Sequence, residues 1–301
     1  IMGKSKRFGE MIALEYINKI EPETEKQFSA ITVILPDNTI YVSYRGTDNT
    51  LIGWKEDFNM IFKSHIASQI SAKEYLENIA KKYPNKKIRI GGHSKGGNLA
   101  VYASIFADSE VKKRIINVYN NDGPGFNEDI INTEEYKKSI EKVITYIPQD
   151  SIFGMLLNHE EKYTVVQSTQ KGVMEHDVYS WQVIGRNFVV LKEVTNGSKF
   201  IDKTITNWLK NLDLQTREQV IDIVFEIINS TEARTIADLK LSLMKNAKII
   251  LSSYKHIEPE NKKMITATIT ALFGIVKENV KEEYKNNINK EKENLWKKTI
   301  N

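Results

Sequence analysis

The chain of 301 residues contains no cysteine, which excludes disulfides, thiolate metal sites and a cysteine nucleophile. The longest apolar run, Met264 to Val276, is too short to cross a bilayer and is interrupted by threonines. The absence of cysteine fits a reducing cytosol, and we expect a cytoplasmic protein. No segment of this sequence resembles a signal peptide. The sequence begins at Ile1 rather than at a methionine, so we leave open a targeting segment before it.

Charge of one sign is also lacking. The 43 basic and 39 acidic residues leave a formal net charge of +4, which is too balanced to favour nucleic acid as a partner. With 41% hydrophobic and 27% charged residues, the composition is typical of a globular protein. A chain of this length can hold one large α/β domain and an appendage.

One glycine-rich segment stands out. Residues 92–96 read Gly-His-Ser-Lys-Gly, with a strand-like run at 87–90 before them and a helix-like run at 97–103 after them. Strand, tight turn and helix are the context in which G-x-S-x-G forms a nucleophile elbow, which exposes its serine above the sheet edge. Side chains two positions before and after the serine would collide in such a turn. The sequence therefore predicts Ser94 as a nucleophile.

Strand-like and helix-like segments alternate along the first two thirds of the chain. The expected strands are residues 28–35, 39–44, 87–90, 115–119, 143–147 and 163–166, and the expected helices are 5–20, 69–83, 97–103 and 128–142. This alternation predicts an α/β fold with a mostly parallel central sheet. Polar residues 128–142 are also a candidate lid.

No strand-like run remains beyond residue 198. Thr216 to Gln219 resembles a capping box before a helix, and further helical runs cover about 235–254 and 260–285. We expect an α/β-hydrolase domain over residues 1–198 and an all-helical region over 199–301. The lysine- and glutamate-rich segment 277–301 is predicted to be a solvated helix, and a membrane-surface role for it has little support because acidic residues interleave with the lysines.

A serine hydroxyl needs a base, and the α/β-hydrolase order places an acid and then a histidine after the serine. The histidines are His65, His93, His159, His176 and His256. The first precedes Ser94, the second adjoins it and is expected to pack elsewhere, and the last lies in the helical region. We favour His176, which follows the last expected strand, and retain His159 as an alternative or a pocket residue.

Two aspartates are candidates for the acid that orients the histidine. Asp150 follows the carboxyl end of an expected strand and is favoured. Asp122 ends the preceding strand but stands in Asp-Gly-Pro-Gly, a turn signal in its own right, so it is the second choice. The oxyanion hole is expected from the backbone N–H groups of Lys95, after the nucleophile, and Thr47, in a loop after an earlier strand.

These residues together resemble the class 3, fungal-type lipases. The matching segments are Tyr44-Arg-Gly-Thr47, Trp54 and Asp57, and Gly92-His-Ser-Lys-Gly-Gly97. More closely, the chain resembles a bacterial group of lipase-like proteins called Mbeg-like, through Gly91 to Ala100, Asn120 to Phe126 and His176 to Trp181. The resemblance covers residues 5–195. It implies an α/β-hydrolase fold, a Ser94–Asp150–His176 triad and an oxyanion hole from Thr47 and Lys95.

Lys95 departs from the lipase pattern, where leucine usually follows the nucleophile. Its cation would favour anionic substrates if it faced the site, but we expect it to turn away and pair with a surface carboxylate. The predicted function is a serine hydrolase that cleaves acyl esters without a metal or organic cofactor. The alternatives are a thioesterase or peptidase with the same triad, and a non-catalytic binding module on a hydrolase fold.

Overall fold

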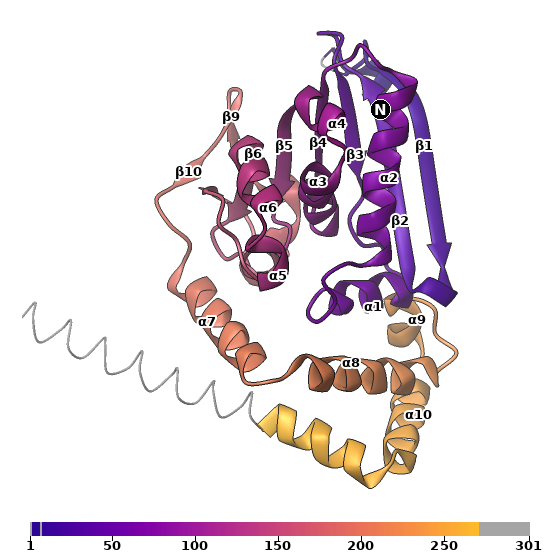
Figure 1. Cartoon of the computed structure of the whole chain (residues 1–301). Helices are drawn as coiled ribbons and strands as arrows, with labels where there is room; N and C mark the ends of the chain where they lie inside the picture. The colour runs from indigo at the N-terminus through magenta and orange to yellow at the C-terminus, as the bar shows by residue number, and fades with distance from the viewer. Residues whose placement is uncertain (1, 7, 271–301) are drawn as a thin grey trace, which may run out of the picture.

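The computed structural model describes residues 2–6 and 8–270, and within them an eight-stranded sheet forms the centre of the fold (Figure 1). The strands lie in the order β1-β2-β3-β4-β5-β6-β7-β10. Their bounds are β1 (Ile12–Glu21), β2 (Lys26–Ile34), β3 (Ile40–Tyr44), β4 (Ile88–His93), β5 (Ile115–Asn121), β6 (Val143–Pro148), β7 (Tyr163–Val166) and β10 (Val190–Leu191). Strands β3 to β7 pair in parallel, and the antiparallel pairs are β1 with β2, β2 with β3, and β7 with β10, which confirms the predicted mostly parallel sheet.

Helices connect and cover the strands. The α-helices are α1 (Leu51–Asn59), α2 (Ala67–Lys82), α3 (Lys95–Phe106), α4 (Ser109–Arg114), α5 (Glu128–Ile131), α6 (Glu134–Ser139), α7 (Asn196–Lys210), α8 (Leu214–Asn229), α9 (Ile236–Leu241) and α10 (Leu243–His256). Short 3₁₀ turns are η1 (Met2–Lys4), η2 (Pro22–Thr24), η3 (Ile140–Lys142), η4 (Phe153–Met155), η5 (Gly172–His176) and η6 (Val178–Ser180). A small hairpin of β8 (Val183–Ile184) and β9 (Asn187–Phe188) precedes β10.

The core is centred on β4 and α3. Leu99, Ala100 and Ala103 of α3 are completely buried, as are Ile88 and Ile90 of β4. Helix α2 packs beside α3 over the same face of the sheet (Figure 1). Because both elements that flank residue 94 are locked into the core, the turn between them has a fixed position.

Most expected elements are confirmed, but the helix predicted over residues 5–20 is wrong. Strand β1 occupies Ile12–Glu21 and pairs with β2 along nearly its whole length, with one irregularity between Ala13 and Glu15. The apolar residues of this segment fit both a helical and an alternating spacing, so periodicity alone was ambiguous. The segment forms a strand rather than a helix because pairing with β2 satisfies the backbone hydrogen-bonding groups of both segments.

The C-terminal region is helical as far as it is described, and residues 259–270 form a further helical segment after α10. Helix α8 begins at Leu214 rather than at Thr216, because the Asp213 side chain caps it by accepting the Thr216 N–H at 2.8 Å. The proposed domain boundary at residue 198 falls inside α7. The expectations for residues 271–285 and 277–301 lie outside the described residues.

The C-terminal helices dock on α1, at the end of the sheet where the parallel strands finish (Figure 1). The Lys55 ammonium pairs with Asp222 of α8, and the rings of Phe58 and Phe225 meet edge to face at 5.8 Å between centroids. The Arg217 guanidinium donates to the Ile61 carbonyl at 3.2 Å. In the part of the chain that is described, no helix combines the length and the apolar character needed to cross a membrane.

Candidate active site

Ser94 occupies the sharp turn between β4 and α3. Its backbone angles, φ 58° and ψ −132°, are strained for a residue with a side chain. Glycines at positions 92 and 96 make the turn feasible: a Cβ on Gly92 would come within 2.3 Å of the Gly96 carbonyl carbon, and a Cβ on Gly96 within 2.3 Å of the Tyr44 carbonyl oxygen. The turn therefore has the steric form of the predicted nucleophile elbow.

His176 and Asp122 form a hydrogen-bonded pair near the elbow. The His176 ring donates from Nδ1 to Oδ2 of Asp122 over 2.6 Å. Asp122 follows β5 directly and its side chain is buried, whereas the side chain of His176 is 21% exposed. The second oxygen of Asp122 accepts the Gly154 N–H at 3.1 Å and the hydroxyl of Ser151, so the carboxylate is held in place from both sides.

The structure differs here from the expected contact of Asp150 with the histidine: the carboxylate that contacts His176 belongs to Asp122, the second choice. Asp150 instead accepts the Gly172 N–H at 3.2 Å and the hydroxyl of Thr195. Gly172 opens the turn that carries His176, and Thr195 caps α7. Asp150 thus ties the histidine loop to α7. Both aspartates end neighbouring parallel strands, and chain order alone could not distinguish them.

Two rings hold the His176 side chain. His93, expected to pack away from the site, stacks on His176 with 4.4 Å between centroids and donates from Nε2 to the His176 carbonyl oxygen at 2.6 Å. Burial, reinforced by the neighbouring His176, lowers the pKa of His93, so its ring favours the neutral form. Phe153 packs on His176 at 4.2 Å. No sequence signal pointed to Phe153, because only the tertiary fold brings it to the ring.

The two predicted oxyanion donors lie around the elbow. Gly46 sits against it so closely that a Cβ there would be 2.7 Å from the His93 carbonyl oxygen and 3.3 Å from the Ser94 Cβ. The neighbouring Thr47 donates its hydroxyl to Oδ2 of Asp57 at 2.5 Å, which fixes the loop. Among the described residues, the backbone N–H groups of Thr47 and Lys95 have no protein acceptor.

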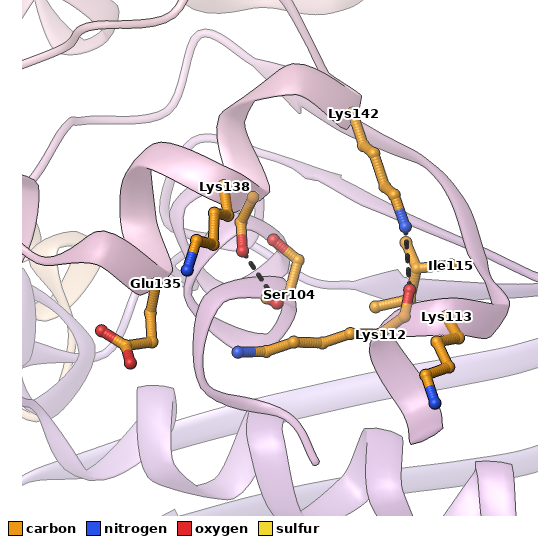
Figure 2. A pocket seen from close by; sticks show the side chains of 8 residues that line it. Ser104, Lys112, Lys113, Ile115, Glu135, Lys138 and Lys142 are labelled. Carbon is orange, nitrogen blue, oxygen red and sulfur yellow. Dashed lines mark hydrogen bonds between the residues drawn. The ribbon is translucent and has the colours of Figure 1, made fainter. Parts of the chain in front are cut away.

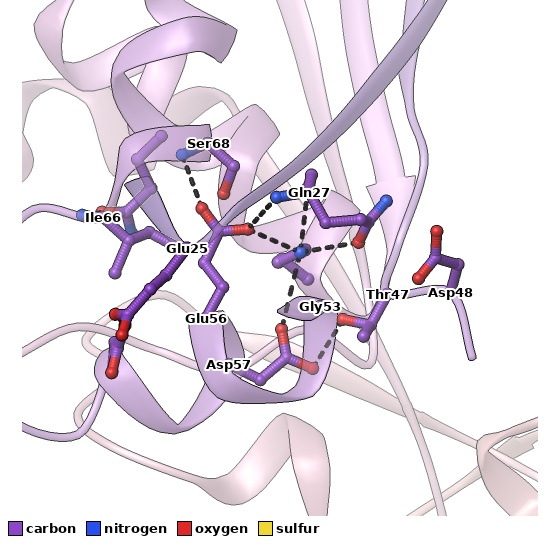
Figure 3. Close-up of polar contacts among 12 residues, drawn as sticks. Glu25, Gln27, Thr47, Asp48, Gly53, Glu56, Asp57, Ile66 and Ser68 are labelled. Atoms are coloured by element: carbon purple, nitrogen blue, oxygen red, sulfur yellow. Dashed lines mark hydrogen bonds and ion pairs between the residues drawn. The ribbon is translucent and has the colours of Figure 1, made fainter. Parts of the chain in front are cut away.

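The Lys95 side chain turns away from the site, as expected, but its partner is buried rather than at the surface. Its ammonium donates to Oε2 of Glu56 at 2.9 Å and to the side-chain and backbone oxygens of Gln27 at 2.8 and 3.0 Å. Glu56 also accepts the backbone N–H groups of Gln27 and Ser68, at 3.0 and 2.8 Å (Figure 3). The Lys95 side chain therefore links α3 to β2 and α1 in the interior, and its ammonium points away from the site.

Asp57 joins this interior cluster to the oxyanion loop. Its Oδ1 lies 3.8 Å from the Lys95 ammonium and its Oδ2 accepts from Thr47 (Figure 3). Burial raises the pKa of Asp57 to about 6, although the Lys95 charge and the Thr47 hydroxyl oppose the shift. The sequence singled out Asp57 as part of the lipase-like pattern. It did not identify the neighbouring Glu56 as the partner of Lys95.

A small apolar cavity of about 120 Å³ opens beside Ser94. Its polar lining is restricted to Ser94, Lys95 and Asp57; the apolar residues are Trp54, Phe58, Met60, Ile61, Pro124, Phe153, Leu156, Leu157, Ile205, Trp208 and Leu209. Three of these belong to α7, so the helical region forms a wall of the site. The candidate lid over residues 128–142 contributes no residue, and its Tyr136 and Ile130 are buried in the core.

His159 lies apart from the lining of this cavity. Its Nδ1 contacts Oε1 of Glu161 at 3.1 Å, and Glu161 also accepts the hydroxyl of Tyr136 at 2.9 Å. His159 thus pairs with Glu161 outside the lining of the cavity at Ser94. Within the described residues, no cluster of three or more histidine, aspartate or glutamate side chains is arranged to hold a metal ion.

Comparison with solved structures finds lipases. The Rhizomucor miehei lipase is 15% identical, with 54% of this chain and 58% of that chain covered and a TM-score of 0.40. The Lip2 lipase from Yarrowia lipolytica is 14% identical (52% and 65% covered, TM-score 0.35), and a triacylglycerol lipase from Penicillium expansum is 12% identical (53% and 71% covered, TM-score 0.36). These scores are too low to bear on activity.

No curated protein matches the chain. A family model named Mbeg1-like matches residues 2–226, which extends past the sheet and through most of α8. The family thus includes the first two C-terminal helices with the sheet, further than the resemblance in the sequence suggested. Because this match covers most of the chain, the chain belongs to the Mbeg1-like family.

Proposed function

We propose that the protein is a serine hydrolase that cleaves acyl esters, with Ser94 as nucleophile, His176 as base and Asp122 as the acid that orients the base. The observation that carries the proposal is the 2.6 Å hydrogen bond between His176 and Asp122 beside a strained, glycine-flanked serine turn. A serine, a histidine and a buried carboxylate in this order are the parts that acyl transfer through serine requires.

In the proposed reaction, Nε2 of His176 removes the proton from Ser94 as its Oγ attacks the ester carbonyl. Asp122 fixes the tautomer by accepting from Nδ1, and its negative charge stabilises the imidazolium that forms. The imidazolium then protonates the leaving alcohol. A water molecule enters, gives its proton to His176 and releases the acid from the acyl-enzyme by the same route.

The negative charge of each tetrahedral intermediate would be met by the backbone N–H groups of Thr47 and Lys95. The turn places Lys95 at the first position of α3, where the helix dipole also favours an anion. Asp57 supports this arrangement by holding the Thr47 hydroxyl, and Glu56 supports it by anchoring the Lys95 side chain. Donors fixed before the substrate binds need little reorganisation during the reaction.

A fluorophosphonate probe tests the proposal, because it reacts with activated serines. We expect labelling of the native protein and none of Ser94→Ala. The matched control is Ser252→Ala, at an exposed serine of α10, which should label like the native protein. On a p-nitrophenyl ester, Ser94→Ala should lower kcat by roughly 10⁴ to 10⁶. Ester hydrolysis by Ser94→Ala at the native rate would overturn the proposal.

A further inference from the structure

We propose that the C-terminal helices build the site for the acyl chain of the substrate: a groove between α1, α7, α8 and residues 259–270 that receives a long fatty-acyl chain attached to Ser94. This inference rests on the proposed function for its substrate class. It gives a role to the part of the chain that lies beyond the sheet.

The groove adjoins the cavity at Ser94. It has a volume of about 370 Å³, three times the 120 Å³ of the cavity beside the serine. Five residues line both spaces: Trp54, Phe58, Ile61, Trp208 and Leu209. An acyl chain that starts at the Ser94 cavity would reach the groove past these five shared side chains, all of which are apolar.

The rest of the groove is also apolar. Its further lining is aliphatic or aromatic except for Thr268 and Arg217, and it includes Val224 of α8 and Ile269 of the facing segment. Arg217 carries the one charge on this wall, and its guanidinium is occupied by the carbonyls of Leu209, Leu212 and Ile61. A wall of this kind favours hydrocarbon and offers little to a polar ligand.

The helices that form the groove are fixed to each other and to the site. The Trp208 indole donates to the Thr268 carbonyl at 3.0 Å, which links α7 to residues 259–270. Arg217 links the end of α7 to the loop after α1, and Lys55 pairs with Asp222 of α8. At the start of α7, the Ser198 hydroxyl donates to the Ser151 carbonyl, next to the aspartate partner of His176.

Part of the apolar wall of the groove is exposed to solvent, and this exposed surface favours an apolar ligand. Val224 is 37% exposed and Ile269 is 48% exposed, so the wall leaves apolar surface uncovered. An acyl chain that enters from the Ser94 cavity would cover this surface. Because burial of each methylene strengthens binding by about four-fold, the groove gives long acyl chains a large advantage over short ones.

One cavity elsewhere in the molecule lacks these properties. A pocket of about 340 Å³ is bordered by Lys112, Lys113, Lys138 and Lys142 (Figure 2). It includes Ile115, the first residue of β5, whereas Ser94 follows the last residue of the neighbouring parallel strand β4. The lysine pocket therefore lies at the opposite end of the sheet from the nucleophile, and its charges disfavour hydrocarbon.

The first test measures binding without catalysis. Dodecanoate, below its micelle concentration, is titrated into Ser94→Ala by calorimetry, and again into Ser94→Ala carrying Val224→Trp, which fills the groove from α8. The control is Glu226→Trp, the same addition at an exposed position two residues along that lies outside the lining. We expect binding to weaken ten-fold or more with Val224→Trp and to stay within about two-fold with Glu226→Trp.

The second test measures kcat/KM of the full chain on p-nitrophenyl esters from butanoyl to dodecanoyl. We expect the native rate constant to rise with chain length, and Val224→Trp to lower the dodecanoyl-to-butanoyl ratio at least ten-fold while Glu226→Trp does not. If Val224→Trp does not fold, Ile269→Trp fills the groove from the facing segment and serves the same purpose.

The outcomes separate the two proposals. Dodecanoate binding that only the groove variants weaken supports the acyl site, even if fluorophosphonate fails to label Ser94, in which case the proposed function alone is wrong. Absence of dodecanoate binding, or equal loss in both tryptophan variants, overturns the acyl site while leaving the serine proposal intact. A change of oligomeric state in Val224→Trp, without any effect on dodecanoate, would show that a second copy covers the groove and would also overturn it.

Discussion

The imidazole of His176 and the carboxylate of Asp122 meet at 2.6 Å although they lie 54 residues apart in the chain. The contact joins the residue after β5 to the turn η5, and β6 and β7 lie between these two elements in the sequence. His93 and Phe153 hold the ring from two sides. This contact favours Asp122 over Asp150 as the acid that orients the proposed base, His176.

Replacement of the two aspartates should separate their roles. Asp122→Asn removes the charge that stabilises the imidazolium and permits the wrong tautomer, so kcat/KM on an ester should fall by roughly 10⁴. Asp150→Asn leaves the His176 contact intact and should lower kcat/KM by less than about ten-fold. Steady-state kinetics on p-nitrophenyl butanoate checks both. Larger loss with Asp150→Asn would return the acid role to Asp150.

The elbow glycines should tolerate no side chain. In Gly96→Ala the new Cβ meets the Tyr44 carbonyl oxygen at 2.3 Å, and backbone cannot move aside cheaply, so we expect a loss of about 2 kcal/mol or more in the free energy of unfolding. Gly197→Ala, whose Cβ would meet only the Thr195 hydroxyl at 3.7 Å, should change stability by less than about 1 kcal/mol. Urea unfolding measures both variants, and similar losses would contradict the steric account.

The buried ion pair should show strong coupling. Lys95→Met leaves the Glu56 carboxylate buried without its cation, and Glu56→Gln leaves the buried ammonium with only the more distant Asp57 carboxylate, 3.8 Å away. Lys95→Met should therefore cost about 3 to 5 kcal/mol, and Glu56→Gln somewhat less. The double variant should cost less than the sum by at least about 1 kcal/mol, because neither charge is then left alone. Denaturant unfolding of the four proteins gives the coupling. Additive losses would mean that the two side chains act independently.

The Glu161 carboxyl should contribute to acid stability. Burial opposes its ionisation, but the His159 ring and the Tyr136 hydroxyl outweigh burial and lower its pKa to about 2, from 4.5. Since the folded pKa is the lower one, its contribution is complete above about pH 5 and is lost as pH falls toward 2. We expect roughly 3 kcal/mol over this window.

Unfolding of native protein and Glu161→Gln at several pH values checks this expectation. The variant should be less stable at pH 7 and should lose less stability than the native protein between pH 5 and pH 2. Glu160→Gln, at the exposed neighbour, should follow the native curve. Parallel curves for native protein and Glu161→Gln would show that the interaction with His159 is too weak to shift the pKa.

The sequence by itself determined the local features of this protein. The turn at Ser94 could be predicted because two glycines and the flanking strand and helix restrict the backbone over a few residues. The strands expected over residues 28–35 and 39–44 also form, as β2 and β3, and the turn between them is short because the Asp37 side chain accepts the Thr39 N–H. The change to helices after the last strand followed from composition and spacing alone.

Only the tertiary structure decided the contacts between distant segments. Asp122 and Asp150 both follow parallel strands, and the choice between them depends on where the loop carrying His176 returns to the sheet. Strand β1 formed where a helix was expected, because a partner strand was available. The burial of Lys95 and the position of Trp208 beside Ser94 are further examples. Such contacts are selected by packing and charge across the whole fold, which no window of sequence contains.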